Sequence, residues 1–191
     1  MTESMDEGPR RVVVLGVTGS GKTTAGRRIA AAIGGALIEL DALHWEANWT
    51  EVEPTVFQER LRAAIAGKAR WVTDGGYHSY VWEITWVRAD TIVWLDYPLR
   101  LSMWRLFRRS VRRIVQREEL WAGNRETIRT QFFSRNSLFL WARTSHAKYK
   151  TAYPERFAQP ELAHVRVLRF QRPAEFEAWV RTLEGQARST E

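Results

Sequence analysis

Five short apolar runs, rich in β-branched residues, recur along the chain and predict five buried strands. They lie at residues 12–15, 36–40, 70–74, 91–97 and 164–170. Runs of helical period separate them, at 25–33, 57–67, after Pro98, from about 126 to 149, and after Pro173. Strands that alternate with helices predict right-handed crossovers and a parallel sheet covered on both faces, with ligands at the carboxyl ends of the strands.

The helix expected after Pro98 combines basic and apolar residues. Its apolar positions predict one apolar face for packing on the rest of the protein. They are Leu101, Trp104, Leu106, Phe107, Val111, Ile114 and Val115.

The segment GVTGSGKT at 16–23 follows the first strand and precedes the first helix, and it matches the phosphate-binding pattern GxxxxGK[ST]. Glycines let the backbone wrap around an anion at the positive end of the following helix. Lys22 is expected to reach the β- and γ-phosphates of a nucleoside triphosphate, and the Thr23 hydroxyl to hold Mg²⁺. A chance Gly-rich turn is the alternative, which the strand–loop–helix context disfavours. The predicted nucleotide-binding residues are Gly16, Thr18, Gly19, Ser20, Gly21, Lys22, Thr23 and Thr24.

Two carboxylates follow predicted strands at the same edge of the sheet as this loop. Asp41 ends the second strand and Asp74 ends the third. A carboxylate in this position can hold Mg²⁺ through water or accept the proton of an attacking hydroxyl group. Each Asp could instead cap a helix or form a turn. We predict a catalytic role for both, with Lys22, and a metal-binding role for Asp74 with Thr23.

Four Arg residues of the basic helix recur at helical spacing, so several of them share a face. They are Arg108, Arg109, Arg112 and Arg113, with Arg117 and Arg125 further along. A lid at about 108–125 that carries Arg over the nucleotide would neutralise charge on the transferred phosphoryl group. A solvated basic face is the alternative for some of them. Arg109 and Arg113 are the predicted catalytic pair.

An aromatic cluster comes directly after Asp41, formed by His44, Trp45 and Trp49. An acceptor molecule could stack against such a wall, whereas ordinary packing is the alternative for at least one Trp.

The overall composition predicts one cytoplasmic domain. The 191 residues carry a net charge of +7 and no Cys, which excludes disulfides and thiolate chemistry. No apolar stretch approaches the length of about 18 residues that a membrane span needs, and the polar start of the chain is unlike a signal peptide. We expect a single domain at 10–184, with an acceptor-binding segment at about 41–70 and disordered ends at 1–9 and 185–191. Monomer and homodimer both stay open.

These motifs together resemble the adenylate-kinase-related P-loop kinases. The resemblance rests on GVTGSGKTT, LDALHW, WVTDGGY, RADTIVWLDYP and the Arg-rich helix, in that order, and runs from about residue 11 to 170. It is nearest to the branch called FlaR-like or DNA topology modulation proteins. The resemblance implies a three-layer α/β fold of the P-loop nucleoside triphosphate hydrolases, with a five-stranded parallel sheet, helices on both faces and an Arg-rich helical lid.

One motif departs from that family and bears on the acceptor. Asp74 resembles the Asp of the kinase motif DGFPR, but Gly76, Tyr77 and His78 stand where the motif has Phe, Pro and the Arg that grips the phosphate of AMP. Asp41 with its aromatic neighbours is nearer, in position, to kinases of small hydroxylated metabolites such as shikimate.

The leading hypothesis is therefore a Mg²⁺-dependent kinase that moves the γ-phosphate of ATP to a small nucleotide-like or hydroxylated acceptor. A nucleic-acid-associated regulator that binds ATP is less favoured, because no known nucleic-acid module appears and a basic lid explains the charge. A nucleoside triphosphatase without a small acceptor is the third alternative.

Overall fold

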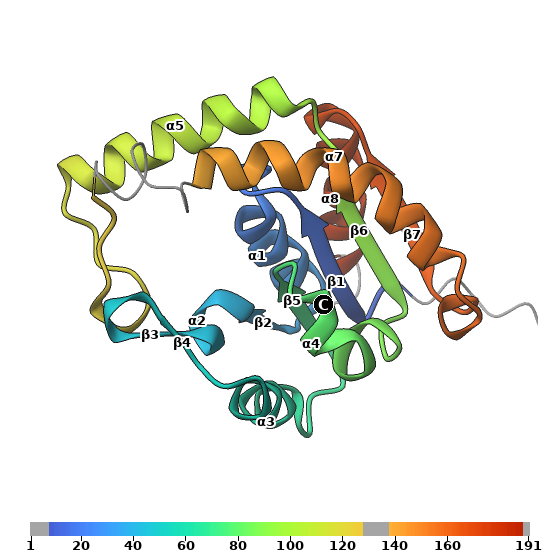
Figure 1. Cartoon of the computed structure of the whole chain (residues 1–191). Helices are drawn as coiled ribbons and strands as arrows, with labels where there is room; N and C mark the ends of the chain where they lie inside the picture. Colours follow the sequence, from blue (N-terminus) through green and yellow to red (C-terminus); the bar gives the residue numbers. More distant parts are fainter. Residues whose placement is uncertain (1–7, 128–137, 189–191) are drawn as a thin grey trace, which may run out of the picture.

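The structure is a computed structural model that describes residues 8–127 and 138–188. Its centre is a five-stranded parallel sheet in the order β2-β5-β1-β6-β7 (Figure 1). The strands are β1 (Arg11–Gly16), β2 (Ala36–Glu39), β5 (Trp71–Asp74), β6 (Thr91–Leu95) and β7 (Arg166–Phe170). The α/β class with a five-stranded parallel sheet, predicted from the sequence, is confirmed.

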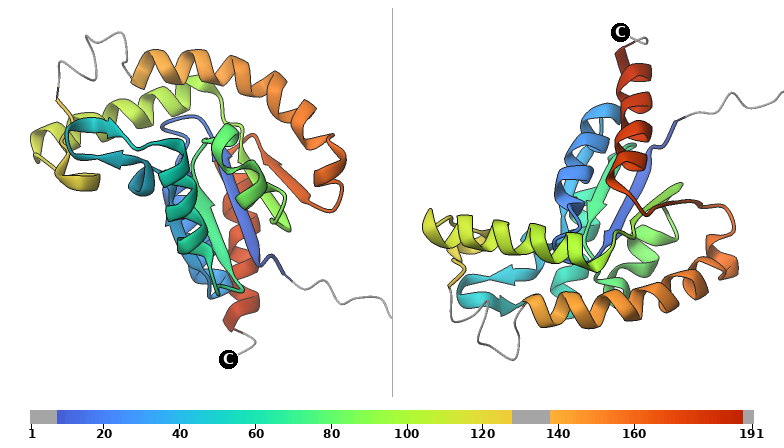
Figure 2. Two further views of the ribbon diagram at one scale, coloured as in Figure 1. Left: turned by 60° about the horizontal axis from the view of Figure 1, so that its bottom comes forward. Right: turned by 90° about the horizontal axis from the view of Figure 1, so that it is seen from above.

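The alternation of side chains along β1 divides the core into two layers. Val12 and Val14 pack with α1 (Lys22–Ile33) and α8 (Pro173–Arg188) on one face of the sheet. Val13 and Leu15 pack with α3 (Pro54–Ile65) and α7 (Leu138–Phe157) on the other. The two views in Figure 2 show the sheet between these helices. A strand buried on both faces explains why β1 reads as an unbroken apolar run.

Local sequence sets the ends of the regular helices. The Gly34 residue that follows α1 has a φ of 61°, and the Gly35 amide donates to the Ala30 carbonyl oxygen at 2.9 Å. This closure of the last turn is typical of a glycine-terminated helix. Pro54 opens α3, where a missing amide hydrogen costs no hydrogen bond.

Short elements fill the segment between β2 and α3, and the sequence pattern did not predict them. The helix α2 (Leu40–His44) leads into an antiparallel pair, β3 (Trp45–Glu46) and β4 (Thr50–Glu51), joined by the 3₁₀ turn η1 (Ala47–Trp49). We call residues 45–51 the hairpin. After β5 come α4 (His78–Val81) and the π-helix η2 (Trp82–Trp86). Elements of two to five residues are too short for periodicity to reveal.

The helix α5 (Leu99–Val115) forms where it was predicted, but its predicted packing face is right only in part, at Leu101 and Leu106. Its buried positions are Ser102, Leu106 and Ser110. The predicted apolar side chains Trp104 and Phe107, with Val111 and Val115, are instead exposed. The buried positions recur every four residues and share one side of the helix. Near its start this side packs closely on the phosphate-binding loop, where a β-carbon added at Gly19 would lie 2.2 Å from the Ser102 carbonyl oxygen.

Two segments near the C-terminus also differ from the prediction. The helix expected at about 126–149 is described as α7, at Leu138–Phe157, because Glu126 lies in a loop and residues 128–137 are outside the described part. The loop before it contains η3 (Trp121–Gly123), and η4 (Pro160–Leu162) follows α7. The prediction of a disordered tail from Gly185 is wrong up to Arg188, because α8 continues to that residue, and residues 189–191 lie outside the described part. No described helix is both long enough and apolar enough to span a bilayer.

Candidate active site

The phosphate-binding loop lies between β1 and α1, at the carboxyl edge of the sheet. Three of its glycines have a positive φ, namely Gly16 at 150°, Gly19 at 83° and Gly21 at 96°. The Ser20 amide donates to the Val17 carbonyl oxygen at 3.1 Å, and the Lys22 ammonium group donates to the same oxygen at 3.2 Å. The loop is therefore a closed turn whose glycines adopt conformations that other residues avoid. Thr18 is partly buried beside it, and Thr24 is exposed at the start of α1.

Asp74 lies against this loop and contacts its Thr residue. The Thr23 hydroxyl donates a short hydrogen bond to Asp74 Oδ2, whereas Asp74 Oδ1 has no partner among the described residues. Burial raises the pKa of the Asp74 carboxyl, while Lys22 and the hydrogen bond from Thr23 oppose that rise. A buried carboxylate oxygen without a partner, beside a hydroxyl group, is a donor set that suits Mg²⁺. These residues fit the metal role that the sequence predicts for them.

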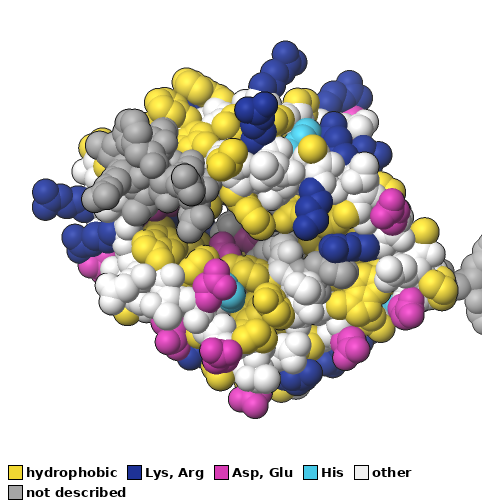
Figure 3. Space-filling view, viewed as in Figure 1, with side chains coloured by type: hydrophobic (Ala, Val, Ile, Leu, Met, Phe, Trp, Pro, Cys, Tyr) yellow, Lys and Arg dark blue, Asp and Glu magenta, His cyan; other side chains and the backbone are white. Residues whose placement is uncertain are grey.

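Asp41 lies in the first turn of α2, which directly follows β2, the strand that pairs with the strand of Asp74. β2 and β5 pair in register, with Glu39 opposite Asp74, so Asp41 follows two residues beyond that pair. The Tyr77 hydroxyl donates to Asp41 Oδ1 at 2.6 Å and fixes the orientation of the carboxylate. Burial, and then the charge of Asp41, raise the pKa of Tyr77, so the phenol stays protonated and keeps donating. Figure 3 shows a hollow at the centre of this face with acidic side chains inside it.

The predicted Arg set divides between the two sides of α5. Arg109 is largely buried, its Nε has no hydrogen bond among the described residues, and burial lowers its pKa while Asp41 and Asp74 oppose that shift. Arg113 donates to Glu126 Oε1 at 2.9 Å, in a pair whose side chains are 15% and 2% exposed. Arg108 and Arg112 instead face solvent. The structure thus points the two Arg residues predicted to be catalytic inward.

Sequence reasoning missed a third Arg on the same face of α5. Arg105 donates to the Ser20 carbonyl oxygen at 3.0 Å, and its guanidinium lies 5.4 Å from the centre of the Tyr97 ring. It therefore ties α5 to the phosphate-binding loop. The spacing of four residues between Arg105, Arg109 and Arg113 is the signal that could have identified it.

The aromatic cluster after Asp41 is packed around a buried residue, His44. His44 is 5% exposed, with ring centroids 4.9 Å from Trp45 and 4.5 Å from Tyr77. Trp45 and Trp49 meet edge to face at 5.6 Å. His44 thus packs behind the Tyr77 ring that orients Asp41. The side chain of His78 lies outside what the structure describes.

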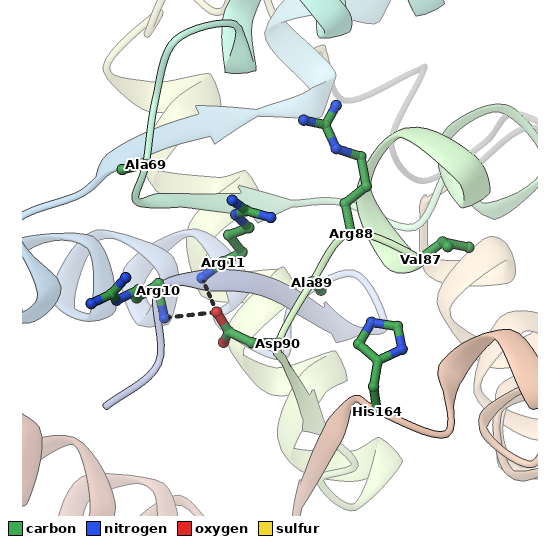
Figure 4. Close-up of a pocket in the computed structure, with 8 residues that line it drawn as sticks. All are labelled: Arg10, Arg11, Ala69, Val87, Arg88, Ala89, Asp90 and His164. Atoms are coloured by element: carbon green, nitrogen blue, oxygen red, sulfur yellow. Dashed lines mark hydrogen bonds between the residues drawn. The ribbon is translucent and has the colours of Figure 1, made fainter. Parts of the chain in front are cut away.

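A separate hollow of about 440 Å³ lies at the opposite edge of the sheet, near the amino ends of the strands (Figure 4). Its floor includes Asp90, whose Oδ2 accepts the backbone amides of Arg10 and Arg11 at 3.0 and 2.7 Å. The Asp90 backbone also joins β1 to β7, through Arg11 and Arg166. These contacts hold the strands together, and the phosphate-binding residues are not among those lining the hollow.

Comparison with known proteins finds similar small-molecule kinases, although no family model matches the sequence. The chain is 26% identical over 167 residues to a shikimate kinase of Corynebacterium glutamicum, covering 82% of this chain and 96% of that protein. Two solved structures, each 18% identical, share the fold. A shikimate kinase from Acinetobacter baumannii in complex with shikimate matches with a TM-score of 0.53, over 97% of both chains. A gluconokinase from Sinorhizobium meliloti matches with a TM-score of 0.52, over 95% of this chain and 93% of that one. The chain therefore has the fold of the P-loop small-molecule kinases.

Proposed function

We propose that this protein is a Mg²⁺-dependent kinase that transfers the γ-phosphate of ATP to a hydroxyl group of a small polyhydroxylated acceptor. One observation carries the proposal. Two parts of the site lie at the same edge of the sheet. One is the phosphate-binding loop, whose Thr23 contacts Asp74, and the other is the Asp41 carboxylate, which Tyr77 orients. The similarity to a shikimate kinase over most of the chain supports the same reading.

The nucleotide half of the site consists of the loop residues 16–24. Backbone amides around Gly19 and Gly21 would hold the phosphates, and Lys22 would neutralise the β- and γ-phosphate charge. Thr23 and Asp74 would hold Mg²⁺, which supplies further charge neutralisation between these phosphates when it is bound. Holding the metal requires Asp74 to ionise, and Lys22 favours that ionised form.

Asp41 would act on the acceptor. Its carboxylate would accept the proton of the acceptor hydroxyl as that oxygen forms a bond to the γ-phosphorus and the bond from the γ-phosphorus to the bridging oxygen of ADP breaks. The products are ADP and a phosphate ester, and the proton resides on Asp41 until it passes to solvent. Tyr77 would keep the carboxylate aimed at the acceptor through the 2.6 Å hydrogen bond.

Arg109 would stabilise the transferred group. Its charge lies within electrostatic reach of both Asp41 and Asp74, and its Nε has no hydrogen-bond partner among the described residues. A guanidinium in a poorly solvated site stabilises developing phosphoryl charge more strongly than an exposed one does. Arg113 is paired with Glu126, so we propose that it holds the lid in position and does not contact phosphate directly.

The charge of the acceptor side favours a hydroxylated compound over a nucleoside monophosphate. The carboxylates of Asp41 and Asp74 both face this region, and they attract hydroxyl donors and repel a phosphate group. An acceptor with several hydroxyl groups and at most one carboxylate, which Arg109 could balance, fits this charge pattern. Shikimate and gluconate, which the similar proteins' names suggest, are members of that class.

A panel assay tests the proposal. ADP release with MgATP is measured across polyhydroxy acids, sugars, polyols and nucleoside monophosphates, with mass detection of the product. We expect one polyhydroxylated compound to raise the rate of ADP release by about tenfold or more. Mass detection should show that this compound has gained a phosphate group. Stoichiometric release of inorganic phosphate with every compound would instead indicate a triphosphatase. Binding of duplex DNA that falls steeply with salt would support the nucleic-acid alternative. The narrower FlaR-like branch and a cytoplasmic location stay predictions.

A further inference from the structure

A buried Asn in the loop after α5 bridges to the hairpin. Asn124 is 5% exposed, and its Oδ1 accepts the Trp49 amide at 2.9 Å. Its Nδ2 donates to the Glu46 carbonyl oxygen at 2.7 Å and to the Trp121 carbonyl oxygen at 2.9 Å. Both donor hydrogens of the side chain and its acceptor oxygen are therefore used in one geometry.

The chemistry of these bonds explains why the residue is Asn. In an ordinary tight turn the carbonyl of the first residue would accept the amide of the fourth. Here the carboxamide of Asn124 inserts between the Glu46 carbonyl and the Trp49 amide and satisfies both. An Asp would place a negative oxygen against the two carbonyl groups, and an Ala would leave buried polar groups without partners.

The hairpin needs this support because its turn is strained. Asn48 and Trp49 both have a left-handed backbone, with φ values of 61° and 56°. A bulky residue such as Trp rarely adopts that conformation without contacts that hold it. A second hydrogen bond also holds Trp49, because its Nε1 donates to the Arg125 carbonyl oxygen at 3.4 Å. The loop after α5 thus holds the turn at two neighbouring residues, Asn124 and Arg125.

The same loop connects to the nucleotide side through α5. At the start of the helix, Arg105 binds the Ser20 carbonyl oxygen of the phosphate-binding loop. Near its end, Arg113 binds Glu126, two residues after Asn124. At the other end of this series of contacts, the hairpin directly follows α2, which carries Asp41.

We infer that Asn124 is a positioning residue that couples the nucleotide loop, through α5, to the hairpin beside the acceptor carboxylate. This inference rests on the proposed function for the role of the two sites. Nucleotide bound against Ser20 steadies α5, and Asn124 transmits that order to residues 45–51. When ATP is bound, the hairpin beside Asp41 is therefore ordered for binding of the acceptor.

Hydrogen exchange of residues 45–51 tests the coupling without a known acceptor. We use the full chain, with and without Mg²⁺ and the non-hydrolysable analogue AMPPNP. In the wild type we expect the analogue to slow exchange in the hairpin. In Asn124→Ala and Asn124→Asp we expect exchange there to be roughly tenfold faster, the effect of one lost hydrogen bond, with no slowing by the analogue. The dissociation constant for the analogue should stay within about twofold, since the hydrogen bonds of the Asn124 side chain go to Glu46, Trp49 and Trp121 and none goes to the phosphate-binding loop.

Gln116→Ala is the matched control, because Gln116 is exposed at the end of α5 and its side chain takes no part in the contacts between Asn124, Arg125 and the hairpin. It should behave as the wild type does, and exchange in β1 and β6 should be unchanged in all variants. Unaltered hairpin exchange in Asn124→Ala, or slowing by the analogue that persists in it, would overturn the inference. So would a wild type that binds the analogue without slowing of the hairpin. A wild type that fails to bind the analogue at all would instead count against the proposed function.

Discussion

The two halves of the site are built in opposite ways. The nucleotide half is built mainly from one continuous segment, residues 16–24, and takes only Asp74 from a distant strand for the metal. The acceptor half is assembled from three distant segments, which supply Asp41, Tyr77 and Arg109. A site encoded locally can keep its geometry through its own backbone. A site assembled from distant segments depends on the packing that brings them together, which here includes the Asn124 contacts.

The largest effect should come from the nucleotide half. Lys22→Ala removes the charge that faces the phosphates, and we expect turnover with any acceptor to fall by about a hundredfold or more. Coupled ADP release measures the loss. Lys68→Ala, in an exposed position after α3, is the control and should leave turnover unchanged. Activity retained in Lys22→Ala would contradict the assignment of the loop.

A change in the acceptor half should separate the two halves. Asp41→Asn keeps the size of the side chain and the bond from Tyr77 but removes the charge that would accept the hydroxyl proton. We expect kcat/KM for the acceptor to fall by roughly 10²–10⁴, the usual contribution of a general base. Calorimetry should find the affinity for MgATP analogues unchanged. An equal loss of nucleotide affinity would show that the halves are not separate.

The sequence predicts the features that depend on a local pattern better than those that depend on contacts between distant segments. The loop residues, Asp74 and the five strands were within reach, because each depends on local pattern and on the rule that parallel strands end at one edge. Arg105 and Asn124 were not predicted, since the role of Arg105 depends on which face α5 buries and that of Asn124 on where the hairpin lies. The apolar face predicted for α5 was wrong at Trp104, Phe107, Val111 and Val115. Hydrophobicity alone does not encode the contact of Gly19 with the Ser102 backbone.

The contact between the loop and α5 can be tested by adding one carbon atom. In Gly19→Ala the new β-carbon would lie 2.2 Å from the Ser102 carbonyl oxygen and 3.0 Å from Leu106 Cβ. We expect a loss of about 2–4 kcal/mol in the free energy of unfolding, from overpacking added to backbone strain.

Gly67→Ala provides the matched control for that change. Gly67 has a φ of 68°, similar to the 83° of Gly19, but an added β-carbon there meets nothing within 4 Å. The difference between the two variants in chemical denaturation therefore isolates the contact with α5. Equal destabilisation would show that backbone strain alone is responsible.

The smallest expected effect concerns pH. Because burial raises the pKa of Asp74 above its unfolded value, the native state favours the protonated carboxyl. The stability that the protonated Asp74 carboxyl contributes is fully present at pH values below the ordinary pKa of Asp. It is lost as the pH rises through the higher pKa that Asp74 has in the folded state. Asp74→Asn should therefore be more stable than the wild type near neutral pH without nucleotide or metal, by about 2–4 °C in Tm.

The advantage of Asp74→Asn should shrink as the pH falls. Thermal unfolding at several pH values measures it, and Asp90→Asn at the opposite edge of the sheet provides a comparison. A gap in Tm that stays constant with pH would count against the raised pKa. The variant should also lose Mg²⁺-dependent turnover, because an amide is a poorer ligand for this ion than a carboxylate.

The central claim is transfer of a phosphoryl group to a small hydroxylated acceptor, and the fate of that group tests it most directly. ATP labelled with ¹⁸O in the γ-phosphoryl group is incubated with Mg²⁺, the wild-type protein and a panel of polyhydroxylated compounds, and the products are analysed by mass spectrometry. We predict that the label appears in a phosphate ester of one such compound, and that Lys22→Ala lowers the yield of this ester by about a hundredfold or more in the same time. Label found in inorganic phosphate alone, whichever compound is present, would contradict the account.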